Sequence, residues 1–158
     1  MKLKDAIKQD TFESPYEEVF LNLLVTHSWV MHELGRTMAQ FGITPAQYNV
    51  LRILRGSHPE KLTCGAIRER LIDKTPDVTR LLDRLLKKGW VTRRRSRKDR
   101  RVVEVGITQQ GLELLEQMDE PVQTFIRNIT RHLDEEEARQ LSQLLEKLRI
   151  DMQQGLAS

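Results

Sequence analysis

The sequence has 158 residues, of which 39% are hydrophobic and 31% are charged, a balance typical of one folded domain rather than of a disordered chain. The single cysteine, Cys64, excludes an internal disulfide, and no apolar run is long enough to span a bilayer, so we expect a cytoplasmic protein with no membrane partner. The net charge is only +3, but eleven lysine or arginine residues and two aspartates lie between Arg80 and Arg101. This segment therefore carries +9 and the rest of the chain −6, a distribution typical of a binding site for a polyanion.

One long helix is predicted in the first third of the chain. Leu3, Ala6 and Ile7 form a shorter apolar stripe before it. Ser14 followed by Pro15 has the form of an N-cap and a first helical residue, and apolar residues then recur at spacings of three and four towards Phe41. This pattern predicts one long amphipathic helix.

Three short helices are predicted between residues 44 and 88. Thr44 before Pro45 and Thr75 before Pro76 have the form of helix starts, and Thr63 can cap a helix after a brief extended segment, 61–63. In the third helix, which ends at Gly89, one face is apolar and is expected to be buried; it comprises Val78, Leu81, Leu82, Leu85 and Leu86. The other face is polar and basic, and it carries Pro76, Thr79, Arg80, Asp83, Arg84 and Lys87.

A two-stranded hairpin and two further helices complete the prediction. Segments 90–94 and 102–107 are rich in β-branched residues, and the charged segment 95–101 between them is expected to form the tip. Thr108 can cap the next helix, in which Pro121 predicts a break or a kink. The last helix opens at Asp134, and its apolar residues recur with near-heptad spacing at Leu141, Leu144, Leu145, Leu148 and Met152. The predicted fold class is therefore mainly α with a small antiparallel β wing.

This order of elements is suited to reading duplex DNA. One α-helix fits the major groove, and a narrow hairpin can reach the neighbouring minor groove. The start of the third short helix, at Thr75 and Pro76, is expected to offer free backbone N–H groups to a phosphate. Asp99 is expected to orient a neighbouring arginine of the tip by a charge-assisted pair.

The sequence resembles the multiple antibiotic resistance regulator (MarR) family of winged helix-turn-helix transcription regulators. The residues that carry the resemblance are 73–85, 88–93, 99–101 and 108–111, and the order of elements matches from about residue 14 to 153. The resemblance implies a homodimer in which 1–43 and 108–158 form a helical dimerisation region and 44–107 form the winged DNA-binding lobe. It further implies a pseudo-palindromic operator on double-stranded DNA, and a repressor that a small phenolic or anionic effector releases.

The resemblance also implies roles for individual residues. In the recognition helix, contacts to bases and phosphates are expected from Thr75, Pro76, Asp77, Thr79, Arg80 and Arg84. In the wing, Arg101 is expected to enter the minor groove with Asp99 steering it, while Arg94, Arg95, Arg97 and Lys98 add either contacts or an attractive field. The candidate lining residues of an effector pocket are His27, Trp29, Met31, His32 and Tyr48, although packing within the helices explains most of them equally well.

Several alternatives stay open on the sequence. Asp83 has the form of a partner for Arg80 or Arg84 within the helix more than of a cytosine reader. Cys64 is interpreted as a small core residue, with a redox-responsive regulator as the alternative. The four histidines lack the spacing of metal ligands, and no catalytic motif or cofactor signature is present, so we expect neither an enzyme nor a cofactor. A winged-helix module that binds only proteins is the competing function, and a metal-dependent nuclease is a weaker one because clustered carboxylates are missing from the basic face.

Overall fold

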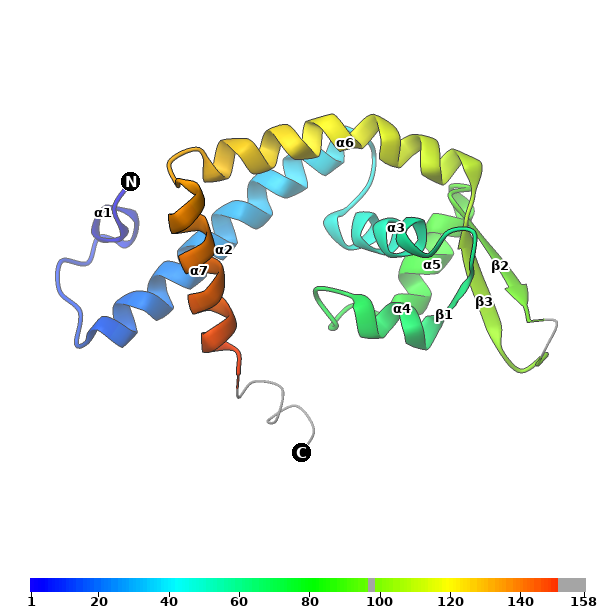
Figure 1. The fold of residues 1–158 in the computed structure, drawn as a ribbon, viewed down its shortest axis with the longest axis horizontal. Coiled ribbons are helices and arrows are strands. Elements are labelled where there is room, and N and C mark those ends of the chain that lie inside the picture. Colours follow the sequence, from blue (N-terminus) through cyan, green and yellow to red (C-terminus); the bar gives the residue numbers. More distant parts are fainter. Residues whose placement is uncertain (97–98, 151–158) are drawn as a thin grey trace. The chain divides into compact units, whose positions relative to one another are not determined.

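A computed structural model describes residues 1–96 and 99–150 of the chain (Figure 1). The chain divides into two compact units, Met1–Val122 and Gln123–Ser158. Most of the described residues are helical and the strands form one small antiparallel sheet, so the predicted fold class is confirmed. In chain order the elements are α1 (Leu3–Ile7), α2 (Pro15–Ala39), α3 (Pro45–Ser57), β1 (Leu62–Thr63), α4 (Cys64–Arg70), α5 (Val78–Lys87), β2 (Val91–Arg95), β3 (Val103–Ile107), α6 (Gln109–Thr130) and α7 (Glu135–Leu148).

Four helices begin where the sequence places their caps. The hydroxyl groups of Ser14 and Thr63 each accept a backbone N–H from the first turn of α2 and α4. Thr44 and Asp134 go further, because each forms a reciprocal capping box with the residue three positions on. Local chemistry therefore fixes these four helix starts, and the predictions for them are confirmed.

The start of α5 differs from the prediction. Its N-cap is Asp77 rather than Thr75, and the Asp77 carboxylate accepts the backbone N–H groups of Thr79 at 2.9 Å and Arg80 at 3.4 Å. Thr75 and Pro76 lie in the loop before the helix. Aspartate is at least as good a cap as threonine, and Asp77 directly precedes Val78, the first buried residue of the helix.

The sheet contains one more strand than the expected two-stranded wing. β2 and β3 form the predicted hairpin, with Val91 opposite Ile107 and Arg95 opposite Val103. The brief extended segment before α4 pairs with the other edge of β3 as β1, so the strand order is β1-β3-β2. In Figure 1 the hairpin projects beyond the group of α3, α4 and α5, and β1 ties its base to the start of α4.

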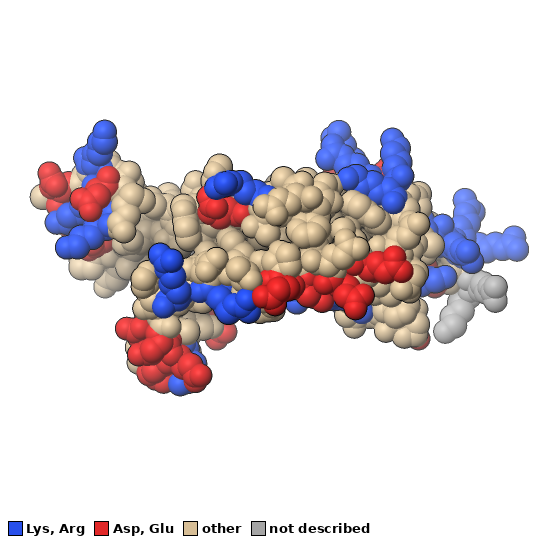
Figure 2. Space-filling view, turned by 90° about the horizontal axis from the view of Figure 1, so that it is seen from above, with Lys and Arg blue, Asp and Glu red and all other residues tan. Residues whose placement is uncertain are grey.

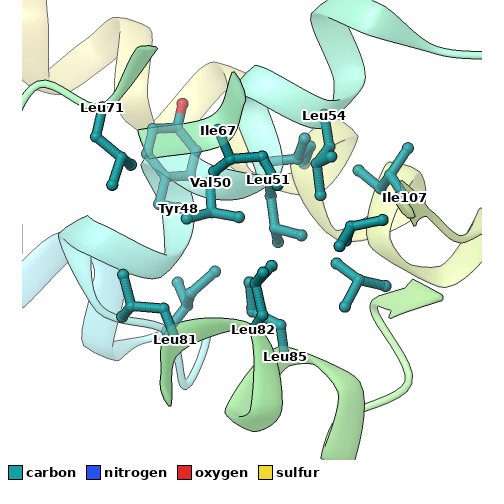
Figure 3. Packing of buried hydrophobic residues seen from close by; sticks show 14 of the residues in the cluster. Tyr48, Val50, Leu51, Leu54, Ile67, Leu71, Leu81, Leu82, Leu85 and Ile107 are labelled. Carbon is teal, nitrogen blue, oxygen red and sulfur yellow. The ribbon is translucent and has the colours of Figure 1, made fainter. Parts of the chain in front are cut away.

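The hydrophobic core of the first unit lies between these three helices and the sheet. Figure 3 shows its side chains converging from α3, α4, α5 and β3. Leu51, Ile67, Leu85 and Val105 are completely buried. The prediction that Leu86 is buried is wrong: its side chain lies at the edge of the apolar face and is 43% exposed. The other four apolar residues of α5 are buried, so apart from Leu86 this helix presents its polar face to solvent.

The first turn of α6 packs directly on the turn that follows α5. The Thr108 hydroxyl donates to the carbonyl oxygen of Gly89 at 2.7 Å and accepts the N–H of Gly111 at 3.1 Å, while the Thr108 N–H donates to the carbonyl oxygen of Trp90. A Cβ atom on Gly111 would lie 2.4 Å from that Trp90 oxygen. The approach therefore requires glycine at this position.

Of the break or kink predicted at Pro121, the break is absent, because α6 continues through the proline to Thr130. Met118 and Val122 are buried on either side of the proline, and this packing outweighs the loss of one backbone hydrogen bond. In the second unit, α7 begins at its predicted position but has no buried residue. None of the helices described over 1–96 and 99–150 is long and apolar enough to cross a membrane.

Candidate nucleic-acid interface

The exposed face of α5 is polar and mainly basic. Because the helix repeats every 3.6 residues, burial of Val78, Leu81, Leu82 and Leu85 turns the other side of the helix outwards. The exposed polar residues are Thr79, Arg80, Asp83, Arg84 and Lys87. The face for which the sequence predicts DNA contacts is thus exposed to solvent, and the opposite face of α5 packs on the hydrophobic core.

The backbone at the start of α5 is less available than the sequence suggested. Asp77 already accepts the N–H groups of Thr79 and Arg80, which are therefore not free to bind a phosphate. Thr75 is exposed in the preceding loop, and its backbone N–H donates to Asp73 at 2.9 Å. This hydrogen bond, together with one from the Thr75 side chain, lowers the pKa of Asp73. The loop is thereby shaped by its own hydrogen bonds, and Pro76 within it is half-buried.

The hairpin carries arginines along its exposed surface. Arg94 and Arg95 end β2 and are exposed, and Arg101 is exposed on the return to β3. Figure 2 shows lysine and arginine side chains projecting at the right, where Figure 1 places the hairpin. The predicted contributions of Arg97 and Lys98 lie outside the described residues.

Asp99 shapes the return of the hairpin through the backbone. Its carboxylate accepts the backbone N–H of Arg101 at 2.9 Å, and its carbonyl oxygen accepts the N–H of Val102 at 3.0 Å. The prediction of a charge-assisted pair between Asp99 and a neighbouring arginine is therefore not met by these two hydrogen bonds. In the structure Asp99 fixes the backbone from which Arg101 projects, and the Arg101 side chain stays exposed.

Asp83 pairs with the hairpin, not with its own helix. Its carboxylate accepts a hydrogen bond from the Arg93 guanidinium at 2.9 Å, between the second turn of α5 and the middle of β2. The expected partners, Arg80 and Arg84, are therefore wrong, although the expected structural role as an ion-pair partner holds. Besides Arg93, Lys88 is also held by contacts within the protein. It donates a hydrogen bond to the Gly42 carbonyl oxygen, and its ammonium group lies 4.6 Å from the centre of the Trp90 ring.

A shallow hollow of about 260 Å³ opens beside the start of α5. Thr79 and Val78 line it from α5, and Arg68, Gly65 and Cys64 line it from α4. Arg68 is exposed, and no sequence motif marks it as a site residue, because it is a single arginine in a short helix. Cys64 is half-buried and packs against the core, which agrees with its interpretation as a small core residue.

The five candidate effector residues fall into two groups. His27, Trp29, Met31 and His32 lie on α2 and are exposed, with Trp29 at 50% and Met31 at 41%. Tyr48 belongs instead to the core of the first unit and is 8% exposed. Over residues 1–96 and 99–150, no three histidine, cysteine, aspartate or glutamate side chains gather as a metal ion would require.

Comparison with known proteins points to one family. The model of the MarR family matches residues 41–102, a range that contains α3 to β2 and ends just before β3. The HTH-type transcriptional repressor MdtR of Bacillus subtilis is 30% identical over 131 residues, or 83% of each chain. Among solved structures, a MarR transcription factor from Planctomyces limnophilus is 38% identical with a TM-score of 0.68, covering 86% of this chain and 98% of that one. A mutant MarR from E. coli complexed with operator DNA is 29% identical with a TM-score of 0.72, covering 86% and 99%.

Proposed function

The chain belongs to the MarR family of transcription regulators, and from this premise we propose that it is a homodimeric repressor that binds a specific sequence in duplex DNA. As in its relatives, the function is transcription regulation and not catalysis. The observation that carries the proposal is the position of two exposed basic surfaces, the outer face of α5 and the hairpin, on one lobe with a shared hydrophobic core. Two copies of such a lobe would recognise a pseudo-palindrome whose half-sites lie about one helical turn, roughly 10 bp, apart.

In this proposal α5 is the recognition helix. Thr79, Arg80 and Arg84 face the major groove, where hydroxyl and guanidinium groups can hydrogen-bond to base edges and phosphates. The loop residues Thr75 and Pro76 approach the adjacent backbone. Asp77 contributes indirectly, because its carboxylate is used to cap the helix.

The hairpin supplies the second set of contacts. Arg101 enters the minor groove from the turn that Asp99 holds, and Arg94 and Arg95 attract the phosphate backbone from β2. Arg97 and Lys98 add to the same positive field. From α4, Arg68 extends the basic surface at the hollow next to Thr79, where its guanidinium can bind a phosphate.

Exposed apolar side chains support the proposed homodimer. Phe20, Leu24 and Trp29 on α2 are 50–57% exposed, and Leu144 on α7 is 63% exposed. Apolar surface repeated at helical spacing is typical of a surface that another protein covers. We assign this role to a second copy of the chain, with 1–43 and 108–158 as the dimerisation region and 44–107 as the DNA-binding lobe.

Replacing Leu144 with aspartate should convert the dimer into monomers. A buried leucine contributes about 1.5–3 kcal/mol, and the change occurs in both subunits. Sedimentation velocity at micromolar concentration measures the outcome. Gln143→Asp is the matched control, because it adds the same charge to the same exposed helix beside the apolar stripe and should leave a dimer. A Leu144→Asp protein that stays fully dimeric would contradict the assignment of α7.

The exposed part of α2 is the candidate region for an effector. His27, His32 and Trp29 offer imidazole and indole groups to a small phenolic or anionic molecule, and Met31 lies one helical turn after His27. Tyr48 would take part only after a rearrangement of the core, since it is buried. Such a molecule would release DNA by changing the distance between the two lobes of the dimer.

Selection of bound duplexes from a random pool tests the proposed function. The pure protein should enrich one sequence with two inverted half-sites whose centres are about 10 bp apart. Aromatic acids can then be added as competitors to the protein bound to the enriched duplex. A pool that gains no common sequence would contradict sequence-specific binding.

A further inference from the structure

We propose that the ion pair between Asp83 and Arg93 is a positioning pair that holds the hairpin at a fixed angle to α5 and thereby sets the affinity for the operator. The inference rests on the proposed function, in which α5 and the hairpin enter neighbouring grooves of one duplex. Neither residue needs to touch DNA for this role. Each acts by fixing where other side chains, above all Arg101, are presented.

The pair joins the two DNA-facing elements at a distance from their shared base. At the base, Leu85 of α5 and Val91 of β2 are both buried in the core. Arg93 follows Val91 by two residues, so alternation along the strand places it on the same face, towards α5. Its Nη1 atom lies 2.9 Å from Asp83 Oδ1. Among the described residues this is the one ion pair that links α5 to the hairpin.

The need for such a link follows from the length of the hairpin beyond the core. The apolar anchoring of the hairpin ends at the level of Arg93, since Val105 opposite it is buried whereas Arg94 and Arg95 are exposed. The connection between α5 and β2 is the short turn at Gly89, which has a φ of 75°. A small rotation about this base would therefore move Arg101 by a larger distance. An ion pair halfway along β2 limits that rotation.

The exposure of the pair favours a geometric role over a stabilising one. The Arg93 and Asp83 side chains are 32% and 51% exposed. Exposed ion pairs contribute little to the stability of a fold, so the loss of this pair should leave the lobe folded. Variants that break the pair, Asp83→Asn and Arg93→Gln, should therefore fold, and their DNA affinities can be compared directly with that of the wild type.

Because Asp83 is negatively charged, the direction in which Asp83→Asn changes the operator affinity tests the proposal. Asp83 is the acidic residue on the otherwise basic exposed face of α5, where a carboxylate repels phosphates. If the residue had no positioning role, Asp83→Asn would remove this repulsion and tighten binding to every duplex. A positioning role predicts the opposite for the operator, while binding to an unrelated duplex stays the same or tightens.

The experiment measures the affinities of the wild type, Asp83→Asn, Arg93→Gln and the double variant for the selected operator and for an unrelated duplex of equal length. Each single change should lower the ratio of operator to unrelated affinity on the order of tenfold, and the double variant should be no worse than either. Arg93→Lys, which keeps a cation within reach of Asp83, should retain most of the ratio. Glu69→Gln on α4 is the control, because it removes one exposed acid that has no ion-pair partner among the described residues; it should leave the ratio unchanged.

Three results would overturn the inference, and each would point to a different role for the two residues. Tighter operator binding by Asp83→Asn would mean that the carboxylate only repels DNA. A loss confined to Asp83→Asn, with Arg93→Gln unaffected, would identify Asp83 as a reader of cytosine. Losses that multiply in the double variant would mean two independent contacts. If the wild type itself did not prefer any duplex, the proposed function would fail first, and the variants would not be needed to show it.

Discussion

Arg101→Ala should weaken binding to the operator by about 1–3 kcal/mol, or roughly five- to 150-fold, while the dimer stays intact. The Arg101 side chain is exposed, and its backbone N–H is held by Asp99. The side chain therefore projects from an ordered turn, which lowers the entropy that its insertion into the minor groove would cost. Fluorescence anisotropy with the selected duplex measures the change in affinity.

Arg100→Ala provides a matched control at the same turn. It removes an identical charge from the adjacent residue, which is also exposed. If the hairpin contributed only a positive field, the two variants would lose the same affinity, because the field depends on charge and distance. We expect Arg100→Ala to lose less than threefold at the same salt concentration, well below the range of a direct contact. Equal losses in both variants would contradict the specific role of Arg101.

Gly111→Ala should have the largest effect on stability, lowering the free energy of unfolding by about 1–3 kcal/mol or more. A Cβ atom there would lie 2.4 Å from the Trp90 carbonyl oxygen and 2.8 Å from Cγ1 of Ile107. The first atom belongs to the backbone and cannot move aside without shifting the turn between α5 and β2. Urea unfolding followed by circular dichroism, at one fixed protein concentration, measures the loss.

Gly35→Ala is the control for this substitution. Gly35 lies inside α2, and a Cβ added there meets nothing within 4 Å. Because alanine has the higher helix propensity, this variant should be more stable than the wild type by up to about 1 kcal/mol. A Gly111→Ala protein as stable as the wild type would mean that α6 does not pack closely on the turn at Trp90.

The helix starts and the hairpin could be predicted because short-range chemistry determines them. Ser14, Thr44, Thr63 and Asp134 each cap a helix with hydrogen bonds to residues three positions away, so the information lies within a few residues. The start of α5 lies two residues after the predicted one, because the local sequence offers two possible N-caps. These are Thr75 before Pro76 and Asp77 before Val78. The helix begins after Asp77, at the residue whose side chain is buried in the core.

Contacts between elements could not be predicted from local patterns. The partner of Asp83 is ten residues away in the next strand, whereas two arginines lie within one helical turn. From the sequence, Tyr48 fits both the apolar stripe of its helix and the lining of an effector pocket. The packing of α3 on α4 and α5 shows that its side chain is buried in the core. The third strand likewise depends on β3 having a free edge beside residues 62–63.

The structure gives a physical reason for motifs that carried the family resemblance. Segment 108–111 and the turn at Gly89 meet each other, with Thr108 bonded to Gly89 and Trp90. Gly111 permits that approach, since any side chain would strike the Trp90 backbone. These residues attach α6 to the base of the hairpin. We therefore expect them to affect DNA binding through the fold and not through contacts with DNA.

The salt dependence of operator binding tests the central claim, that α5 and the hairpin bind duplex DNA through their basic surfaces. Each phosphate neutralised releases a counterion, so the slope of log affinity against log salt counts the ionic contacts. For a dimer whose two lobes each make three or more such contacts, the affinity should fall by about a thousandfold or more between 50 and 200 mM salt. A wild-type protein that binds the selected duplex with the same affinity at both concentrations, or binds no duplex at 50 mM, would contradict the claim.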